Sequence, residues 1–380
     1  MSFDNIEIVP DTWIPEESII KVIGVGGGGC NAVNYMYRQK IEGCTFIVCN
    51  TDRQALDKCD VPVKIQLGED GLGAGTNPTE GRNAALNSQE ELEKILDNNT
   101  KMVFITAGMG GGTGTGAAPV VAEGAKSIGA LTIGIVTKPF NFEGKRRMKQ
   151  ALEGIERLSA QVDSIVTIPN DRLLQIADKN TTLESAFSFA DDILRQGVQG
   201  ISDTIAKPGI INLDFADVRA TMENTGVALM GVGIAKGENR AVTAAKAAIS
   251  SPLLELSIEG AKGILFNISG SNLTLLEAQE AADFIYESAG TDADIMFGAF
   301  NEENGTDEIK ITIIATGFNQ QNPAEQPAAV EKRPAVTAKE NVRPAHQEPV
   351  RGEIPEIKSA LDGVVIPEFL LRKISIRLWK

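Results

Sequence analysis

The chain has 380 residues, of which 42% are hydrophobic, so it is long enough for two domains with sizeable apolar cores and a tail. Its formal net charge of −15 argues against a nucleic-acid-binding protein, because most of its surface would repel a phosphate backbone. No stretch approaches the ~18 apolar residues of a transmembrane helix, and the acidic, proline-containing N-terminus lacks the layout of a signal peptide. We therefore expect a cytoplasmic protein.

The cysteines and the histidine exclude several kinds of site. Cys30, Cys44, Cys49 and Cys59 lack CxxC spacing, which favours reduced, packed thiols over a zinc site or disulfides. The only histidine, His346, lies in a proline-rich segment. This position argues against histidine-based catalytic triads and histidine-ligated metals.

Apolar, β-branched segments alternate with helix-like segments in the first half of the chain, which is typical of a doubly wound parallel sheet. The predicted strands are residues 20–25, 45–49, 103–107, 131–136 and 164–168. Glycine-rich segments at 26–29, 71–75 and 110–116 would all open on the carboxyl edge of this sheet, where ligands bind in such folds. We assign residues 19–181 to this domain, after a flexible segment over residues 1–18.

A long helical pattern over residues 182–206 ends at a Pro-Gly breaker pair and is interpreted as a connecting helix. Strands and helices then alternate again, which predicts a smaller α/β domain over residues 207–318. Its expected elements are residues 226–235, 262–269, 273–288, 293–300 and 308–316. The fold class is therefore α/β, with a parallel-sheet domain, a long connecting helix and a smaller C-terminal α/β domain.

The composition changes after residue 318. Gln, Pro, Ala, Glu and Lys dominate, and no aromatic residue occurs until Phe369. Such a segment cannot bury enough apolar surface to fold alone, so residues 319–363 are predicted to be a disordered linker. Residues 364–380 are apolar and basic again, which predicts a short partner-binding peptide at the end of the tail.

The most informative motif is GMGGGTGTG at residues 108–116, between an apolar strand and an Ala/Val-rich helix. Its glycines leave main-chain amides bare, the helix N-terminus adds a partial positive charge, and Thr113 and Thr115 carry hydroxyl donors. A flexible surface turn needs only one or two glycines, so we favour a phosphate-binding loop. No Lys-Ser/Thr pair follows, which excludes a Walker A loop.

A second glycine-rich motif, GVGGGG at residues 24–29, follows a strand and opens a helix. It also satisfies the GxGxxG pattern of dinucleotide-binding proteins, although Asp52 comes a little late for the acidic residue of that pattern. An NAD-linked oxidoreductase is therefore one alternative, but it leaves the loop at 108–116 unexplained. A di- or triphosphate held between two glycine-rich loops explains both motifs.

These motifs resemble those of the tubulin/FtsZ superfamily of polymerising GTPases, especially its bacterial cell-division branch. The resemblance covers Ile19 to Phe318 almost without interruption, and a short peptide near the C-terminus. It implies GTP and GDP as ligands, Mg²⁺ as cofactor, and head-to-tail filaments that form the cytokinetic ring at the division site. It also implies that the loop at 71–78 senses the terminal phosphate, although Glu69 and Asp70 replace residues that are basic in many members.

The resemblance assigns guanine recognition to Asp191, because a carboxylate can accept hydrogen bonds from both N1–H and the N2 amino group. Phe187, one helical turn earlier, could stack on the base, and Asn31 would add an amide contact. The alternative is that Asp191 and Asp192 are merely solvated helix charges. The full predicted nucleotide-binding set is Gly26, Gly27, Gly28, Gly29, Cys30, Asn31, Ala74, Gly75, Gly110, Gly111, Gly112, Thr113, Gly114, Thr115, Gly116, Glu143, Arg147, Phe187 and Asp191.

Three further members of this set have predicted side-chain properties. The resemblance points to Glu143 at the ribose hydroxyls and Arg147 near the phosphates, which suits a carboxylate acceptor and a guanidinium donor. An ordinary charged first turn of a helix is the alternative. Cys30 lies beside the phosphate loop at a helix N-terminus, so we expect a lowered thiol pKa and protection from alkylation by bound nucleotide.

The predicted catalytic residues are Asn212, Asp214 and Asp217, at the start of a helix. The two carboxylates lie on one face, and a capping box between them is a compatible alternative. About 16 residues of helix, roughly 24 Å, separate Asp191 from Lys207, so Asp214 cannot reach the γ-phosphate of its own chain. The resemblance implies that it completes the pocket of the next subunit, and such a contact repeated without closure makes a filament.

The sequence also leaves open a scaffold that binds GTP without hydrolysing it, and a monomeric signalling GTPase. The tail peptide resembles one that docks on division-protein tethers and regulators, with Ile366, Pro367, Phe369 and Leu370 as apolar anchors. Its basic end, from Arg372 to Lys380, would also suit anionic lipid. We rank partner docking above direct membrane contact, which we expect to be weak or indirect.

Overall fold

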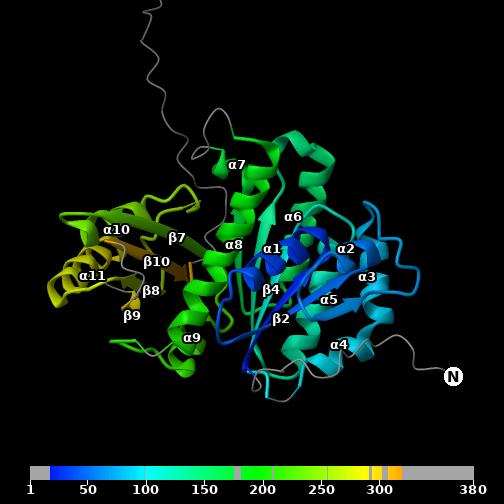
Figure 1. Ribbon diagram of the computed structural model, residues 1–380, viewed down its shortest axis with the longest axis horizontal. Helices are drawn as coiled ribbons and strands as arrows, with labels where there is room; N and C mark the ends of the chain where they lie inside the picture. The colour runs from blue at the N-terminus through cyan, green and yellow to red at the C-terminus, as the bar shows by residue number, and fades with distance from the viewer. Residues whose placement is uncertain are drawn as a thin grey trace, which may run out of the picture. The chain divides into compact units, whose positions relative to one another are not determined.

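The computed structural model describes residues 18–97, 99–174, 181–207, 209–254, 256–290, 293–301 and 307–318. These residues build one ten-stranded sheet with helices packed against it (Figure 1). The predicted linker at 319–363, the tail peptide at 364–380, and all but the last residue of the N-terminal segment lie outside the described residues.

The first half contains six strands. Its elements are β1 (Ile20–Val25), α1 (Gly26–Arg38), β2 (Cys44–Asn50), α2 (Arg53–Asp57), β3 (Val63–Gln66), α3 (Pro78–Asn87), α4 (Gln89–Ile95), β4 (Met102–Gly108), α5 (Thr113–Ser127), β5 (Leu131–Lys138), the 3-10 helix η1 (Asn141–Glu143), α6 (Lys145–Ser159), β6 (Ser164–Pro169) and α7 (Asn170–Leu173). All five predicted strands are present. The sequence did not predict β3, because a four-residue strand reading VKIQ carries almost no apolar pattern.

The second half begins with the connecting helix. Its elements are α8 (Leu183–Ala206), α9 (Phe215–Met222), β7 (Gly226–Lys236), α10 (Arg240–Ile249), β8 (Gly263–Gly270), α11 (Leu275–Ala289), β9 (Asp294–Asn301) and β10 (Glu308–Thr316). The predicted helix at 182–206 is confirmed, with Thr182 as its N-cap. The five predicted elements beyond it are also confirmed, each to within two residues.

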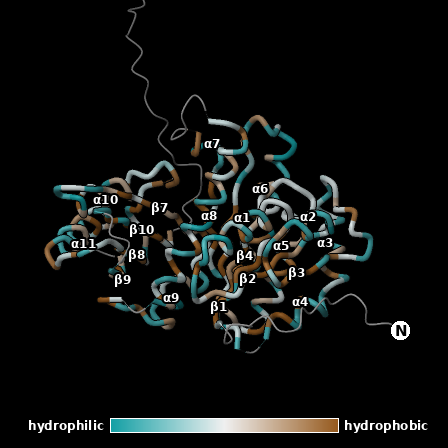
Figure 2. Tube along the Cα trace, in the orientation of Figure 1, coloured by the Kyte–Doolittle hydropathy of each residue, from teal (hydrophilic) through white to brown (hydrophobic). Residues whose placement is uncertain are grey.

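The strand order β3-β2-β1-β4-β5-β6 is parallel throughout, as a doubly wound sheet requires. Alternate residues of one strand enter different cores: Phe46 and Val48 join the core beneath α1 and α8, whereas Ile47 and Cys49 join the core beneath α5. Both faces of the sheet are thus covered by helices, and Figure 2 shows its central strands as strongly hydrophobic.

The two halves share one sheet, which the sequence did not predict. β6 pairs with the start of β7 in parallel, from Ser164↔Gly226 to Val166↔Ala228. The rest of β7 pairs antiparallel with β10, and the order continues through β8 to β9. A single long strand therefore belongs to both halves and joins them through main-chain hydrogen bonds.

The helix α8 packs against strands of both halves, and two of its glycines permit this close approach. A Cβ atom at Gly197 would lie 3.1 Å from Met230 Sδ in β7 and 3.3 Å from Ile135 Cδ1 in β5. A Cβ atom at Gly200 would lie 2.7 Å from Thr312 Cγ2 in β10. Near its middle, the helix therefore packs closely against strands of both halves.

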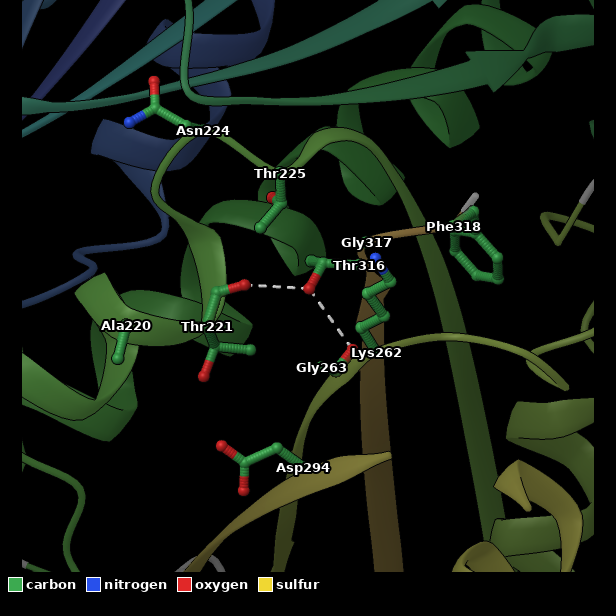
Figure 3. Close-up of a pocket in the computed structure, with 10 residues that line it drawn as sticks. All are labelled: Ala220, Thr221, Asn224, Thr225, Lys262, Gly263, Asp294, Thr316, Gly317 and Phe318. Atoms are coloured by element: carbon green, nitrogen blue, oxygen red, sulfur yellow. Dashed lines mark hydrogen bonds between the residues drawn. The ribbon is translucent and has the colours of Figure 1, made fainter. Parts of the chain in front are cut away.

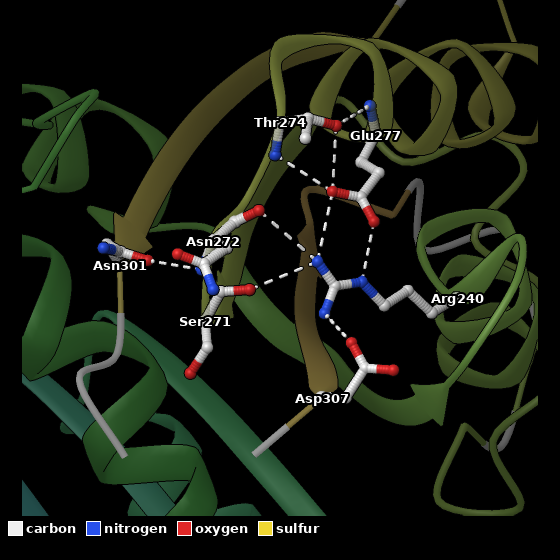
Figure 4. A network of polar contacts seen from close by, with 7 residues as sticks. All are labelled: Arg240, Ser271, Asn272, Thr274, Glu277, Asn301 and Asp307. Carbon is white, nitrogen blue, oxygen red and sulfur yellow. Dashed lines mark hydrogen bonds and ion pairs between the residues drawn. The ribbon is translucent and has the colours of Figure 1, made fainter. Parts of the chain in front are cut away.

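The buried guanidinium of Arg240 forms a network of polar contacts in the C-terminal half (Figure 4). Arg240 Nε donates to Glu277 Oε1 at 2.7 Å, and its NH1 donates to Asp307 Oδ1 at 2.7 Å. Glu277 also forms a capping box with Thr274 at the start of α11. Arg240, whose side chain is 8% exposed, thereby ties together the first turns of α10 and α11 and the segment that enters β10.

We expect Arg240→Gln to lower the free energy of unfolding by about 1–3 kcal/mol at pH 7, because Glu277 loses its charged partner. The Arg240 hydrogen bond lowers the pKa of Glu277 from 4.5 to about 2. A lowered folded-state pKa contributes stability that is present above pH 4.5 and lost as the pH falls toward 2. Urea unfolding at pH 7 and pH 3 should show that the variant differs less from the unmodified protein at pH 3.

Lys149→Gln provides the control, because it removes an exposed i,i+4 ion pair with Glu153. Such a pair contributes less than about 0.5 kcal/mol. Equal effects of the two substitutions at pH 7 would contradict the role assigned to Arg240.

Candidate nucleotide-binding site

The two predicted glycine loops lie side by side at the carboxyl ends of adjacent parallel strands, β1 and β4. A Cβ atom at Gly28 would lie 3.2 Å from Gly108 Cα, and one at Gly26 would lie 2.6 Å from Gly114 N. Gly26 also has φ +71, which disfavours any other residue. The loops therefore pack main chain against main chain, which only glycine permits.

The third glycine-rich segment, around residues 71–77, lies against the second loop. A Cβ atom at Gly112 would lie 2.6 Å from Gly75 O. Gly73 N donates to Thr51 O at 3.0 Å, and Thr51 Oγ1 is 2.6 Å from Thr113 Oγ1. The predicted convergence of all three segments at one edge of the sheet is confirmed.

Two helix N-termini meet at this junction, since Gly26 begins α1 and its Cβ position lies beside Gly114 near the start of α5. Nothing lies within 4 Å of the Cβ position at Gly27 or at Gly111. Neither α1 nor α5 has a side-chain N-cap or an acidic residue in its first turn. Because the first amides of a helix lack internal partners, two helix N-termini here offer hydrogen bonds and partial positive charge to an anion. The residues present therefore fit a polyphosphate.

The two threonines of the second loop already have partners in the chain. Thr115 Oγ1 is buried and accepts a hydrogen bond from Gly110 N at 2.8 Å. Thr113 Oγ1 pairs with Thr51. Both hydroxyls thus hold the loop in shape, and their direct contact with phosphate stays a prediction.

The expectation of a low-pKa thiol at Cys30 is wrong. Its side chain points into the core, where Sγ lies 3.7 Å from Gly24 O and 3.5 Å from Cys49 O, and the residue is 1% exposed. Interaction with the Cys59 thiol and burial raise its pKa well above the ordinary value. Burial outweighs the field of the helix N-terminus, so the thiol does not line the loops. A role for the Cys30 amide stays a prediction.

The neighbouring carboxylates of α8 differ in their partners. Asp192 accepts hydrogen bonds from Arg195 Nε at 2.8 Å and Tyr35 Oη at 3.3 Å, so it is not a free solvated charge. No hydrogen bond or ion pair connects Asp191 to any residue of the described part of the chain. Burial raises the pKa of Asp191 to about 7. A half-buried carboxylate without a partner supports the prediction that Asp191 accepts hydrogen bonds from a ligand.

Aromatic and charged residues near Asp191 also fit the predicted site. Phe187 is 41% exposed and packs edge-on against Phe140, with ring centroids 5.4 Å apart. Glu143 accepts a hydrogen bond from Phe140 N at 2.8 Å and pairs with Arg147 at 3.1 Å. A Cβ atom at Gly110 would lie 2.7 Å from Arg147 Cγ, so Arg147 lies against the phosphate loop. The i,i+4 pair of Glu143 and Arg147 is also what an ordinary charged helix turn forms, so the roles of both residues at the nucleotide stay predictions.

The predicted catalytic residues lie at the other end of α8. Asp214 and Asp217 form the anticipated capping box, with Asp217 N donating to Asp214 Oδ1 at 2.9 Å and Asp214 N donating to Asp217 Oδ2 at 3.1 Å. Asn212 Oδ1 accepts from Gly209 N. About 22 Å of helix separates Asp191 from Ala206, and α9 lies at the end of α8 opposite α7 (Figure 1). Within one chain these residues are remote from Asp191.

The described residues contain no cluster of three His, Cys, Asp or Glu side chains that could hold a metal ion. A Mg²⁺ ion bound mainly by substrate phosphates and water needs no such cluster.

A separate pocket of about 330 Å³ lies between α9 and the strands of the C-terminal half (Figure 3). Its lining includes Thr221, Asn224, Lys262, Asp294 and Thr316. It contains none of the residues predicted to bind nucleotide or to act in catalysis.

Comparison with known proteins identifies the chain. Residues 19–178 match the GTPase domain of the Tubulin/FtsZ family, and residues 226–319 match the C-terminal domain of the FtsZ family. The structure resembles an empty FtsZ dimer from M. jannaschii with 44% sequence identity and a TM-score of 0.76, over 80% of this chain and 89% of that one. The chain belongs to the tubulin/FtsZ family.

A tryptophan-to-tyrosine mutant of M. jannaschii FtsZ gives the same identity and TM-score over 79% of this chain and 91% of that one. CetZ2 from Haloferax volcanii, solved as a GTPγS-bound protofilament, shares the fold with 18% identity and a TM-score of 0.67, over 78% of this chain and 92% of that chain. Membership of the tubulin/FtsZ family decides against the dinucleotide alternative and implies binding of GTP and GDP. In the described part of the chain, no helix is long and apolar enough to span a membrane.

The sequence did not reveal two residues that shape the tubulin/FtsZ nucleotide site. One is Thr51, which links the second and third loops. The other is Gly81 in α3, where a Cβ atom would collide with the carbonyl oxygen of Gly112. No helix was predicted around Gly81, so nothing in the sequence singled this residue out.

We expect Gly81→Ala to weaken GTP binding about tenfold, because the added methyl group must displace the loop at Gly112. Gly124→Ala is the matched control in α5, where the Cβ atom would meet only the flexible Leu96 side chain at 3.3 Å. Titration with a fluorescent GTP analogue measures both affinities. Equal affinities would show that this contact does not position the loop.

We expect Asp191→Asn to stabilise the nucleotide-free protein at pH 8 and to abolish its preference for GTP over ATP. The folded-state pKa of about 7 exceeds the ordinary 3.8, so the stabilising effect of protonation is complete below pH 3.8 and lost as the pH rises through 7. At pH 8 the substitution removes a partly buried charge and should raise the melting temperature by about 2 °C or more. At pH 5 the gain should be smaller.

Asp192→Asn is the matched control, because it disrupts the contacts with Tyr35 and Arg195. It should lower the melting temperature and leave selectivity for guanine intact. Loss of selectivity in Asp192→Asn alone would reverse the assignment of the two carboxylates.

Proposed function

We propose that this chain is a GTPase that assembles head to tail into filaments and hydrolyses GTP at the interface between subunits. We further propose that these filaments form the cytokinetic ring at the division site in the cytoplasm. The observation that carries the proposal is the separation of Asp191 from the Asp214 and Asp217 pair by the length of α8. The dimer and protofilament forms of the similar proteins support self-assembly.

In the proposed complex, amides of the loops at 26–29 and 110–114 hold the phosphates of GTP, assisted by Arg147. Glu143 accepts hydrogen bonds from the ribose hydroxyls, and Asp191 binds the guanine edge beside Phe187. Mg²⁺ neutralises negative charge on the phosphates. Two helix N-termini without side-chain caps support this arrangement.

Hydrolysis proceeds by in-line attack of water on the γ-phosphate and yields GDP and phosphate. Asp214 and Asp217 of the neighbouring subunit orient and polarise that water, with Asn212 beside them. Asp214 is exposed, and its capping bond uses only one carboxylate oxygen, so the other oxygen remains free to face a partner. Loss of the terminal phosphate then weakens the interface and promotes disassembly.

The proposed partners other than copies of this chain are division-protein tethers and regulators. Ile366, Pro367, Phe369 and Leu370 would dock in an apolar groove of such a protein. These residues lie outside the described part of the chain.

We expect Asp214→Asn and Asp217→Asn to retain GTP binding and to lose about 100-fold in turnover. Asparagine is also a good N-cap, so Asp214→Asn removes the carboxylate without removing the cap of α9. Mixing either variant with unmodified protein should lower the activity of the mixture, because each mixed interface lacks one functional partner. Glu223→Gln, at the other end of the same helix, is the control and should keep full turnover.

The experiment that tests the shared site is phosphate release from GTP over a series of protein concentrations, with ATP as control. Specific activity should be near zero at low concentration and rise steeply above a threshold. A concentration-independent specific activity would place the whole active site within one chain. Absence of hydrolysis at every concentration would favour a GTP-binding scaffold.

A further inference from the structure

One face of α1 lies along the segment that follows α2. Cys30, Asn34 and Arg38 are spaced four residues apart, so they share this face. Asn34 Oδ1 accepts a hydrogen bond from Asp60 N at 2.7 Å, and Arg38 Nε pairs with Asp60 Oδ2 at 2.6 Å. These two contacts hold the segment around Asp60 against the helix.

The same arrangement brings two thiols together. Cys59 immediately precedes Asp60, which is bonded to Asn34 one helical turn after Cys30, and both cysteines belong to one apolar cluster. Each thiol also shifts the pKa of the other. Cys59 Sγ lies 3.4 Å from Ala55 O and is the more accessible of the two, at 7% exposed against 1%. The pair therefore has an outer member, Cys59, and an inner member, Cys30.

The two thiols differ in reactivity. Interaction with the Cys30 thiol and the charges of Lys64 and Arg38 lower the pKa of Cys59 to about 7, against the effects of burial and of the Asp60 carboxylate. Interaction with Cys59 and burial raise the pKa of Cys30. At neutral pH a substantial fraction of Cys59 is thiolate, which is the nucleophilic form, whereas Cys30 stays protonated.

We propose that Cys30 and Cys59 form a reversible intramolecular disulfide when a hydroperoxide oxidises the protein. The Cys59 thiolate attacks one oxygen of hydrogen peroxide, which breaks the O–O bond, gives a sulfenic acid at Cys59 and releases hydroxide. The Cys30 thiol then attacks that sulfur, the S–O bond breaks, and the S–S bond forms with loss of water. In sum, two thiols and one peroxide give one disulfide and two waters.

The remaining two cysteines are internal controls. Burial raises the pKa of Cys44 and of Cys49 to about 12. Cys49 is also 0% exposed, so it offers neither a thiolate nor access to an oxidant. Neither should react under conditions that link Cys30 to Cys59.

A consequence for the nucleotide site rests on the proposed function. Cys30 is the fifth residue of α1 and directly follows Gly29. Thr51, which accepts a hydrogen bond from Gly73 in the third loop, lies eight residues before Cys59 in the chain. A disulfide would join these two parts of the site covalently. We therefore expect oxidation to slow the release of bound GDP.

The test is peptide mapping of the full chain under non-reducing conditions after treatment with hydrogen peroxide, in the presence and absence of dimedone. The expected product links the peptides that contain Cys30 and Cys59, with a loss of about 2 Da that dithiothreitol reverses. Cys30→Ser should trap the sulfenic acid, so that dimedone labels Cys59. Cys59→Ser should leave Cys30 reduced, and Cys44→Ala should behave like the unmodified protein.

Several results would overturn the disulfide: no linked peptide in the oxidised protein, a link that involves Cys44 or Cys49, or dimedone on Cys30 in place of Cys59. The dimedone reaction on unmodified protein decides the identity of the reactive thiol even if a serine variant fails to fold. Release of a fluorescent GDP analogue should be about threefold or more slower after oxidation and recover with dithiothreitol. An unchanged release rate would overturn the proposed effect of the disulfide on the nucleotide site. Failure to bind any guanine nucleotide would contradict the proposed function, but the peptide map would still test the disulfide.

Discussion

The structure depends most on the packing of α8 between the two halves of the sheet. Gly197 and Gly200, near the middle of this helix, let it approach strands of both halves closely. Asp191 near its start and the segment leading to Asp214 after its end are thereby held at a fixed separation. The proposed sharing of an active site between subunits follows from that separation, because no bending of a packed helix could bring the two carboxylates to one phosphate.

Main-chain contacts between glycine-rich loops form the second constraint. Gly26 and Gly112 each face backbone atoms of another loop at distances that exclude a side chain, and a Cβ atom at Gly28 would be tightly packed against Gly108. The amides at this junction are therefore positioned by contacts with main chain. The hydroxyl groups of Thr115 and Thr51 add hydrogen bonds that hold the loops in place. A site built in this way holds phosphate without a lysine, because preorganised amides and helix N-termini supply the positive field.

Stability and binding oppose each other at Asp191. Holding a carboxylate half-buried without a partner raises its pKa and destabilises the charged, nucleotide-free protein. Asp192 shows the contrasting solution, since Arg195 and Tyr35 satisfy its charge within the chain. The environment also sets the pKa of each thiol in the pair of Cys30 and Cys59 beside α1. It determines the reactivity of each thiol more than the position of the cysteine in the sequence does.

The sequence by itself determined the strands of the parallel sheet, the connecting helix, the convergence of three glycine-rich loops and the capping box of Asp214 and Asp217. The strands, the helix and the capping box depend on local periodicity or on residues a few positions apart. The convergence of the loops follows from the rule that loops at the carboxyl ends of parallel strands meet at one edge of the sheet. Only the tertiary structure decided that β7 joins both halves, that Gly81 supports the phosphate loop, and that Cys30 is a buried thiol with a raised pKa. These features arise where segments distant in sequence pack together, and burial there overrides the local signal that predicted a reactive thiol at a helix N-terminus.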